Sequence, residues 1–446
     1  RHKDDSSRAG TLTGKGNQLT LRDNELNDYI YCTVTARGFN GSVTSAEYGP
    51  VTEGVFPYLT VTGIRVTAEN FSDILGDDGS VSYDVDTGTL SLNGANLTGT
   101  QTALIYQNDE RDLIVSLLGD NTIAASNNSD NISKGAIYTK GDLCITGTGT
   151  LNVSSPQMSG SYCLIQALGS VTIDGNCDIT ASSRPCVLFA GADLTIADSS
   201  SFTVDPENVT ATTNGNAVTV TKALTVKDSA SLSAVAGDSN AIKAYSVLLN
   251  GGSICAKNNG NPNKSNTNYA FLISTTFTIN KGFVDVYSEL NHALYSYDTV
   301  TFSGGTIIAR TGSSASSSYR PIRLGLNSSN PIVINAPTFT LDLSKQSDGS
   351  AMTTYSDVSN DKVKTLLAAT GSNANHYAKL TSEFPPTVST STSGSGVTVS
   401  VKTDGQQQYL FIARFDSTGH LLELQQALRG EEGIHTATFA PGWPTS

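Results

Sequence analysis

Short runs of alternating apolar and polar residues recur through the middle of the chain. In the stretch SVTIDGNCDITAS, Val171 and Ile173 flank one polar residue, and Ile179 and Ala181 follow after a turn. The first apolar residues of successive runs are 23, 30, 28, 23, 30, 23, 30 and 23 residues apart; they are Leu90, Leu113, Leu143, Val171, Leu194, Leu224, Val247, Phe277 and Val300. Period-two alternation is typical of β-strands, and a repeat of this length indicates stacked units.

Each repeat contains three predicted strands. Two follow the pattern above, and the third starts with a small residue before a large one, as in Ala241-Ile242. Asp174-Gly175 and Asn250-Gly251 are typical turn pairs between the first two strands. The pattern predicts an all-β fold, a right-handed parallel β-helix of about nine three-strand coils over residues 54–345. The extra residues fall between the second and third strands, so we expect variable loops along one edge.

The segment before the first repeat resembles a known family. It reads YLTVTGIRVTAENFSDILGD from Tyr58, then VSYD from Val81 and GTLSLNGA from Gly88. These residues resemble the opening of a β-helix module in secreted surface proteins of Gram-positive bacteria, a family labelled as a carbohydrate-binding domain. The resemblance covers about residues 56–343. It implies an extracellular or cell-surface location and binding of a polysaccharide or of a host or cell-wall glycan, without the site of the related lyases.

The flanking segments indicate additional small modules. Residues 29–36 (YIYCTVTA) and 41–51 resemble the last strands of a bacterial Ig-like repeat, so residues 1–53 are expected to be a partial Ig-like module. Residues 346–395 are interpreted as the exit from the last coil, a short helix at 361–370 and a linker. Residues 396–446 alternate around a turn and are expected to form a small Ig-like β-sandwich.

Charge and hydropathy narrow the classes of partner. The 446 residues carry a net charge of −13, which disfavours nucleic acid and anionic membranes. The sequence has no apolar run near the ~18 residues of a membrane helix, so no membrane insertion is expected in this segment. The chain starts at Arg1 without a signal peptide, and we interpret it as a mature or excised segment. The sequence does not predict an oligomeric state.

The predicted outward positions of the first strand are unsuited to catalysis. They are occupied by threonine, at Thr172, Thr195, Thr225, Thr278 and Thr301, while the outward acids Asp178 and Asp285 are four repeats apart. Pectinases of this architecture need either several aspartates that converge on one strand face, or calcium-binding acids with a basic residue placed to abstract a proton. We therefore expect no enzyme, with a β-helix polysaccharide lyase or glycoside hydrolase as the alternative.

Two acids offer a candidate metal site. Asp112 and Asp142 stand at the corner before the first strand of adjacent repeats, so their carboxylates are expected ~5 Å apart. Such a pair favours Ca²⁺; the alternative, which we favour, is a solvated corner turn without any cofactor. The five histidines are scattered and suggest no further metal site.

Three of the six cysteines can be placed in the repeat. Cys163 and Cys186 are 23 residues apart and fall in a column otherwise filled mainly by alanine. We expect free thiols that pack as small residues, with a disulfide as the alternative. Cys177 is expected outside the core.

The third strand supplies the candidate binding surface. Its predicted outward column is Ile105, Tyr138, Ile165, Leu188, Thr219, Lys243, Leu272, Tyr295 and Arg323. Near the last repeats, six residues are expected to converge: Tyr269, His292, Tyr295, Tyr319, Arg320 and Arg323. Aromatic rings stack on sugars and guanidinium groups bind carboxylates, so these residues, together with Tyr138, suit a uronate-containing glycan. The alternatives are ordinary packing beneath the loop at 311–318 and, for the whole chain, a structural spacer or protein-binding adhesin.

Overall fold

The protein was analysed as a computed structural model. It describes residues 29–34, 41–46, 58–100, 103–125, 135–155, 163–182, 186–204, 215–237, 239–260, 268–313, 315–325, 331–382, 387–393, 396–404, 410–415, 421–427 and 432–439. By chain contacts it divides into one unit of residues 1–57 with 67–69 and a second of residues 58–66 with 70–446. Three of the variable loops expected between the second and third strands, at residues 127–134, 156–161 and 206–214, lie outside the described residues.

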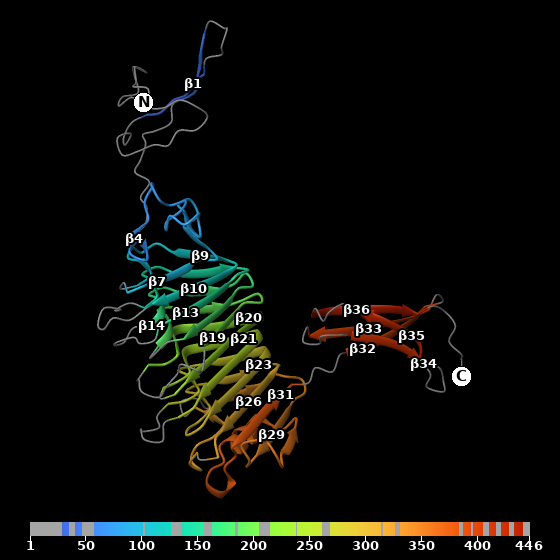
Figure 1. Cartoon of the computed structure of the whole chain (residues 1–446). Coiled ribbons are helices and arrows are strands. Elements are labelled where there is room, and N and C mark those ends of the chain that lie inside the picture. The colour runs from blue at the N-terminus through green and yellow to red at the C-terminus, as the bar shows by residue number, and fades with distance from the viewer. Residues whose placement is uncertain are drawn as a thin grey trace. The chain divides into compact units, whose positions relative to one another are not determined.

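The fold is all-β, and the described residues place 29 strands in its largest sheet. Successive strands occupy three positions in turn, and each pairs in parallel with the strand that holds the same position in the repeat before and after it; β12, for example, pairs with β9 and β15. Figure 1 shows the labelled strands of this sheet following one another from β9 to β26. The repeat predicted from the sequence is therefore present as a parallel pairing.

The strands are assigned to their positions as follows. The first position contains β6 (Thr89–Asn93), β9 (Leu113–Leu118), β12 (Leu143–Gly147), β15 (Val171–Ile173), β18 (Leu194–Ile196), β25 (Val300–Phe302) and β28 (Ile332–Ile334). The second contains β7 (Asn96–Gly99), β10 (Asp120–Ala125), β13 (Thr150–Ser154), β16 (Asp178–Ser182), β19 (Ser201–Val204) and β26 (Thr306–Thr311). The third contains β8 (Ile105–Gln107), β11 (Ile137–Thr139), β14 (Cys163–Ala167), β17 (Cys186–Ala190), β22 (Phe271–Ile273), β24 (Leu294–Ser296) and β27 (Ile322–Leu324). Three long strands run through more than one position: β20 (Val218–Ala236), β21 (Ile242–Asn258) and β23 (Phe277–Ser288).

Alternation along each strand builds the core. In β16, Ile179 and Ala181 are buried while Asp178 and Thr180 are exposed. Ile179 is in register with Leu151 and Phe202 of the neighbouring repeats. Apolar residues in the same column thus stack on one another, and one repeat buries its apolar face only because its neighbours cover it.

Two columns depart from the predicted register. Leu90 pairs with Val115 rather than Leu113. Ile105, Ile165 and Leu188, predicted to face outward, are fully buried and in register with the inward residue Ile137 or with each other. Their outward neighbours are Tyr106, Gln166 and Phe189. The prediction for this third-strand column was wrong because three apolar residues adjoin at each of these places, as in Cys163-Leu164-Ile165, and all three are buried.

Two cysteine predictions were also wrong. Cys163 and Cys186, in register on β14 and β17, form a disulfide, with their Cα atoms 4.4 Å apart. Cys177 is fully buried, and its sulfur lies 3.3 Å from the carbonyl oxygen of Asp174. A thiol is apolar enough to pack in a corner of the core, which the polar neighbours of Cys177 concealed.

The turn at Asp174-Gly175 has the backbone expected of such a pair. Gly175 has φ +75°, and a Cβ atom there would lie 2.6 Å from Thr146 Oγ1 and 2.8 Å from Gly147 N. Its amide donates to Asp198 Oδ2 at 2.9 Å. The stacking of one repeat on the next therefore requires glycine at this corner.

Antiparallel strands cover both ends of the large sheet. At the start, β3 (Leu59–Val61) pairs with β8 and with β4 (Ile64–Arg65), and β5 (Val81–Asp84) pairs with β6. At the end, β31 (Tyr377–Thr381) pairs with β26 and with β29 (Thr340–Ser344), which pairs with β30 (Thr353–Ser356). α1 (Asn360–Leu367) overlaps the helix predicted at 361–370, beginning one residue earlier and ending three residues earlier, and a 3₁₀ turn follows at Gly371–Asn373. These strands leave fewer unpaired edges on the sheet.

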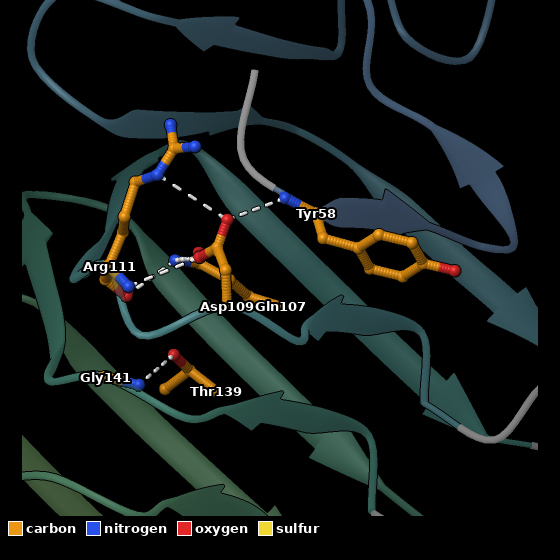
Figure 2. Close-up of polar contacts among 6 residues, drawn as sticks. All are labelled: Tyr58, Gln107, Asp109, Arg111, Thr139 and Gly141. Carbon is orange, nitrogen blue, oxygen red and sulfur yellow. Dashed lines mark hydrogen bonds and ion pairs between the residues drawn. The ribbon is translucent and has the colours of Figure 1, made fainter. Parts of the chain in front are cut away.

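At the start of the large sheet, the Asp109 side chain links β3 to β8 (Figure 2). Its carboxylate accepts from the Tyr58 amide at 2.7 Å and from Gln107 Nε2 at 3.0 Å. Arg111 Nε lies 3.6 Å from the same carboxylate. One side chain thus joins the start of β3 to the turn after β8.

The remaining strands form smaller sheets. β1 (Thr33–Val34) pairs with β2 (Val43–Thr44) in antiparallel fashion. β32 (Thr387–Ser393), β33 (Gly396–Asp404) and β36 (Glu432–Phe439) form a three-stranded sheet, and β34 (Leu410–Phe415) pairs with β35 (Leu421–Ala427). Among the described residues, no helix is long and apolar enough to span a membrane.

Candidate functional site

Six sequence-predicted residues come together at the last repeats. Tyr295 on β24 and Arg323 on β27 are in register, so their outward side chains are adjacent. The others precede third-position strands: Tyr269 lies before β22, His292 before β24, and Tyr319 with Arg320 before β27. We call this group the aromatic–arginine cluster; its members are Tyr269, His292, Tyr295, Tyr319, Arg320 and Arg323.

Aromatic contacts hold the cluster together. The Tyr269 ring lies 5.0 Å from the Tyr295 ring at 65° and 6.0 Å from the His292 ring in a stacked arrangement. Tyr319 meets the His292 ring edge-on at 5.2 Å. Tyr295 and His292 are buried, while Tyr319 and Tyr269 are partly exposed. The cluster therefore has a packed base and an accessible aromatic rim.

Within the part of the chain that the structure describes, the two arginines of the cluster have no acidic partner. Arg323 lies over the Tyr295 ring, with its Cζ 4.7 Å from the ring centroid. Arg320 Nε is buried and has no hydrogen-bond partner. Among the described residues, the ion pairs involve Arg111, Lys227 and Arg310, and neither cluster arginine. Two guanidinium groups without carboxylates form a site for an anion.

Burial and charge shift the ionisation of the cluster. Burial, and then the neighbouring charge of Arg323, lower the pKa of His292 to about 3. Burial and Arg323 also lower the pKa of Arg320, and burial raises the pKa values of Tyr269 and Tyr295. At neutral pH His292, Tyr269 and Tyr295 are uncharged, so the positive charge of the cluster comes from the arginines.

Tyr297 lies beside the cluster, and the sequence pattern alone did not identify it. Its ring lies 4.4 Å from the Tyr295 ring, and its side chain is 39% exposed. The available signal was the sequence Tyr295-Ser-Tyr297, because residues two apart on a strand share one face. Tyr297 enlarges the accessible aromatic rim.

Tyr138 lies apart from the cluster. Register steps through Gln166, Phe189, Thr219, Lys243 and Leu272 separate it from Tyr295, six in all or about 29 Å at ~4.8 Å per step.

At that end of the column, Tyr138 packs in a separate aromatic group. It is 6% exposed and stacks on Tyr106 at 5.5 Å, and Tyr106 meets Tyr58 edge-on at 6.3 Å. Arg65 covers the Tyr58 ring, with its Cζ 4.3 Å from the centroid. Ring faces that pack on each other are unavailable to a sugar, so this group contributes mainly packing.

Asp112 and Asp142 interact with the backbone of the next repeat. Asp112 Oδ1 accepts from the Asp142 amide at 3.0 Å, and Asp142 Oδ1 accepts from the Ser170 amide at 2.7 Å. Asp193 makes the same contact with Ala223 at 2.9 Å. Within the described ranges, no group of three or more histidine, cysteine or acidic side chains is placed to hold a metal ion. The carboxylates have a structural role at this corner, and a Ca²⁺ site at the pair stays a prediction.

The outward acid Asp285 is also engaged. Arg310 Nη2 lies 2.5 and 2.7 Å from its two carboxylate oxygens. The guanidinium therefore neutralises the carboxylate and occupies both of its oxygens.

The fold and the cluster define an all-β repeat protein that presents aromatic and cationic side chains from its third strand position. The chain belongs to the family described as carbohydrate-binding domain-containing protein, whose model matches residues 64–317. The match includes Tyr269, His292, Tyr295 and Tyr297 and ends just before Tyr319, Arg320 and Arg323. No curated protein and no solved structure matches the chain. Family membership supports a carbohydrate-binding role and a sugar as the partner.

Proposed function

We propose that the aromatic–arginine cluster binds an acidic, uronate-containing polysaccharide. The observation that carries the proposal is the pair Arg320 and Arg323, two guanidinium groups with no acidic partner among the described residues of a protein with net charge −13. Tyr297, which is exposed, and Tyr319, which is partly exposed, lie beside them and supply stacking surfaces for sugar rings. Stacking provides affinity for any sugar, and the arginines favour a carboxylated one.

The wider proposal concerns the whole chain. Residues 54–345 form a right-handed parallel β-helix of about nine coils, a reading supported by the parallel register of three strand positions. Small Ig-like modules flank it, supported by the antiparallel pairing of β1 with β2 and the small sheets of β32–β36. The chain is a non-catalytic, adhesive module of a bacterial surface protein, located outside the cell.

The experiment is a binding measurement with the 446-residue chain. The probes are oligogalacturonates and their methyl esters, which keep the sugar ring but lose the charge. The variants are Arg320→Gln/Arg323→Gln and Tyr319→Ala. The control is Lys243→Gln, because Lys243 is an exposed cation of the same column, two register steps from Tyr295.

We expect the wild type to bind the acid more tightly than the ester. The arginine variant is expected to lose about 10- to 100-fold in affinity for the acid, since a hydrogen bond to a charged group contributes roughly 1.5–3 kcal/mol. Lys243→Gln is expected to bind as the wild type does. Equal binding of acid and ester, or an unaffected arginine variant, would contradict the proposal.

The same samples distinguish the proposed function from two alternatives. Release of shortened or unsaturated oligosaccharides would identify a polysaccharide lyase or glycoside hydrolase. Absence of binding to every glycan would favour a spacer or a protein-binding adhesin.

A further inference from the structure

His292 is placed between two N–H groups. The backbone amide of Arg320 donates to His292 Nδ1 at 2.8 Å, and Arg323 Nη1 lies 3.1 Å from His292 Nε2. The ring is 3% exposed, so water does not replace either contact. Both ring nitrogens therefore face a hydrogen-bond donor.

A neutral imidazole has one acceptor nitrogen, and an imidazolium has none. Burial and Arg323 keep the ring neutral at neutral pH, with its pKa near 3. The Arg320 amide is part of the backbone and donates along a fixed direction, so Nδ1 is the acceptor. The ring proton must then be on Nε2, where it faces the guanidinium of Arg323, which can only donate.

Two donors thus point at each other without an acceptor. Arg320, whose charge also acts on the ring, has its Nε buried without a hydrogen-bond partner among the described residues. Leaving a buried donor unsatisfied costs about 1–3 kcal/mol, more beside a charge. An oxygen atom that entered here would satisfy Nε2–H and Arg323 together, with the guanidinium shifting to make room.

We propose that His292 is a specificity-determining residue whose Nε2–H, together with Arg323, binds an anionic oxygen of the sugar. The ligand group is a carboxylate or a sulfate ester, because both present oxygens that only accept. This inference rests on the proposed function and adds a role for the histidine. The neutral ring donates a hydrogen bond to the anion, and the backbone amide of Arg320 fixes the tautomer of the ring.

The first test is the tautomer of the free protein. Nitrogen NMR of the ¹⁵N-histidine-labelled chain, with the His292 signals assigned by their loss in a variant, is expected to show a neutral ring protonated at Nε2. Oligogalacturonate is expected to shift the Nε2–H signal downfield, and its methyl ester is not. A ring protonated at Nδ1 in the free protein would overturn the inference, whatever glycan the protein binds.

The second test uses His292→Asn and His292→Phe. The asparagine amide oxygen can replace Nδ1 as the acceptor for Arg320, but no donor remains at the Nε2 position; phenylalanine removes both. We expect His292→Asn to keep the thermal midpoint close to that of the wild type and to lose 10-fold or more in affinity for oligogalacturonate. Its affinity for the methyl ester is expected to stay within about twofold.

The outcomes separate the inference from the proposed function. If His292→Asn binds oligogalacturonate like the wild type while Arg323→Gln does not, the site is confirmed and the role of His292 is wrong. If His292→Asn and His292→Phe fail alike with acid and ester, the ring has only a packing role. A sulfated galactan oligosaccharide is tested in parallel. If His292→Asn loses affinity only for the sulfated probe, the anion is a sulfate ester. If it loses affinity only for oligogalacturonate, the anion is a carboxylate.

Discussion

Cys163 and Cys186 are joined by a disulfide between adjacent strands of the third position, at the same register. The bond closes a loop of 23 residues that amounts to one repeat. It therefore ties two neighbouring repeats covalently in addition to their ladder hydrogen bonds.

Removal of this disulfide is expected to destabilise the protein. For a loop of this length, the lost constraint on the unfolded chain is about 3 kcal/mol. The change is Cys163→Ala/Cys186→Ala, measured by urea denaturation, with Cys255→Ala as the control because Cys255 is a half-buried free thiol. The denatured wild type should expose four thiols to a colorimetric reagent, from Cys32, Cys144, Cys177 and Cys255. Six thiols and an unchanged midpoint would refute the bond.

The alternation along β16 predicts opposite effects for adjacent residues. Ile179 is fully buried between Leu151 and Phe202, whereas Thr180 faces solvent. Ile179→Ala should lower the free energy of unfolding by about 2–5 kcal/mol, because it removes buried contacts and leaves a cavity. Thr180→Ala should change it by about 0.5 kcal/mol or less. Similar losses for the two variants would mean that the strand register is wrong.

The repeat could be predicted from the sequence because it depends on a local rule. Alternation places Ile179 inside and Thr180 outside, and the fixed spacing of such pairs shows which strands stack. The rule fails where apolar residues adjoin: in Cys163-Leu164-Ile165, all three are buried, so the pattern does not identify the inward position of the strand. The disulfide was missed for a related reason. A column of small residues accommodates free cysteine thiols and a disulfide equally well, and only the geometry of the two side chains distinguishes them.

The site was partly predictable. The convergence of Tyr295 and Arg323 follows from the repeat, because their positions match in neighbouring third strands. The histidine contacts do not follow, because they depend on how the loop before β27 brings the Arg320 amide to the ring. Likewise, the role of Asp142 as an acceptor for the next repeat requires the orientation of a backbone amide, which residue types alone do not specify.

The aspartates at the corner before the first strand allow a test that distinguishes a structural role from metal binding. Asp142→Ala removes the acceptor for the Ser170 amide and should cost about 1 kcal/mol, whereas Asp142→Asn keeps an acceptor oxygen and should cost less. The control is Glu110→Ala, which removes an exposed carboxylate from the turn after β8. Thermal midpoints are measured in EDTA and in millimolar Ca²⁺. We expect no dependence on calcium; a calcium-induced rise in the wild type that disappears in Asp142→Asn would instead establish the Ca²⁺ site.

The lowered pKa of His292 predicts a loss of stability in acid. In the unfolded chain the ring titrates near pH 6.5, and in the folded protein near 3. Between these values the unfolded state binds a proton that the folded state does not, so the free energy of unfolding contributed by this group falls as the pH drops from about 6.5 to about 3. Below pH 3 both states are protonated and the loss is complete.

This loss in the free energy of unfolding is on the order of a few kcal/mol. A variant without the titrating ring measures the contribution of His292 separately. The charged groups that face the ring are Arg320 and Arg323, and the neighbouring aromatic rings are those of Tyr269, Tyr295 and Tyr319. His292→Asn removes the titrating ring, so its free energy of unfolding should fall less steeply than that of the wild type between pH 6.5 and 3. His376→Asn is the control, since its Nδ1 lies 2.8 Å from the Thr311 hydroxyl. Parallel pH profiles for the wild type and His292→Asn would mean that the ring is not held neutral between the arginines.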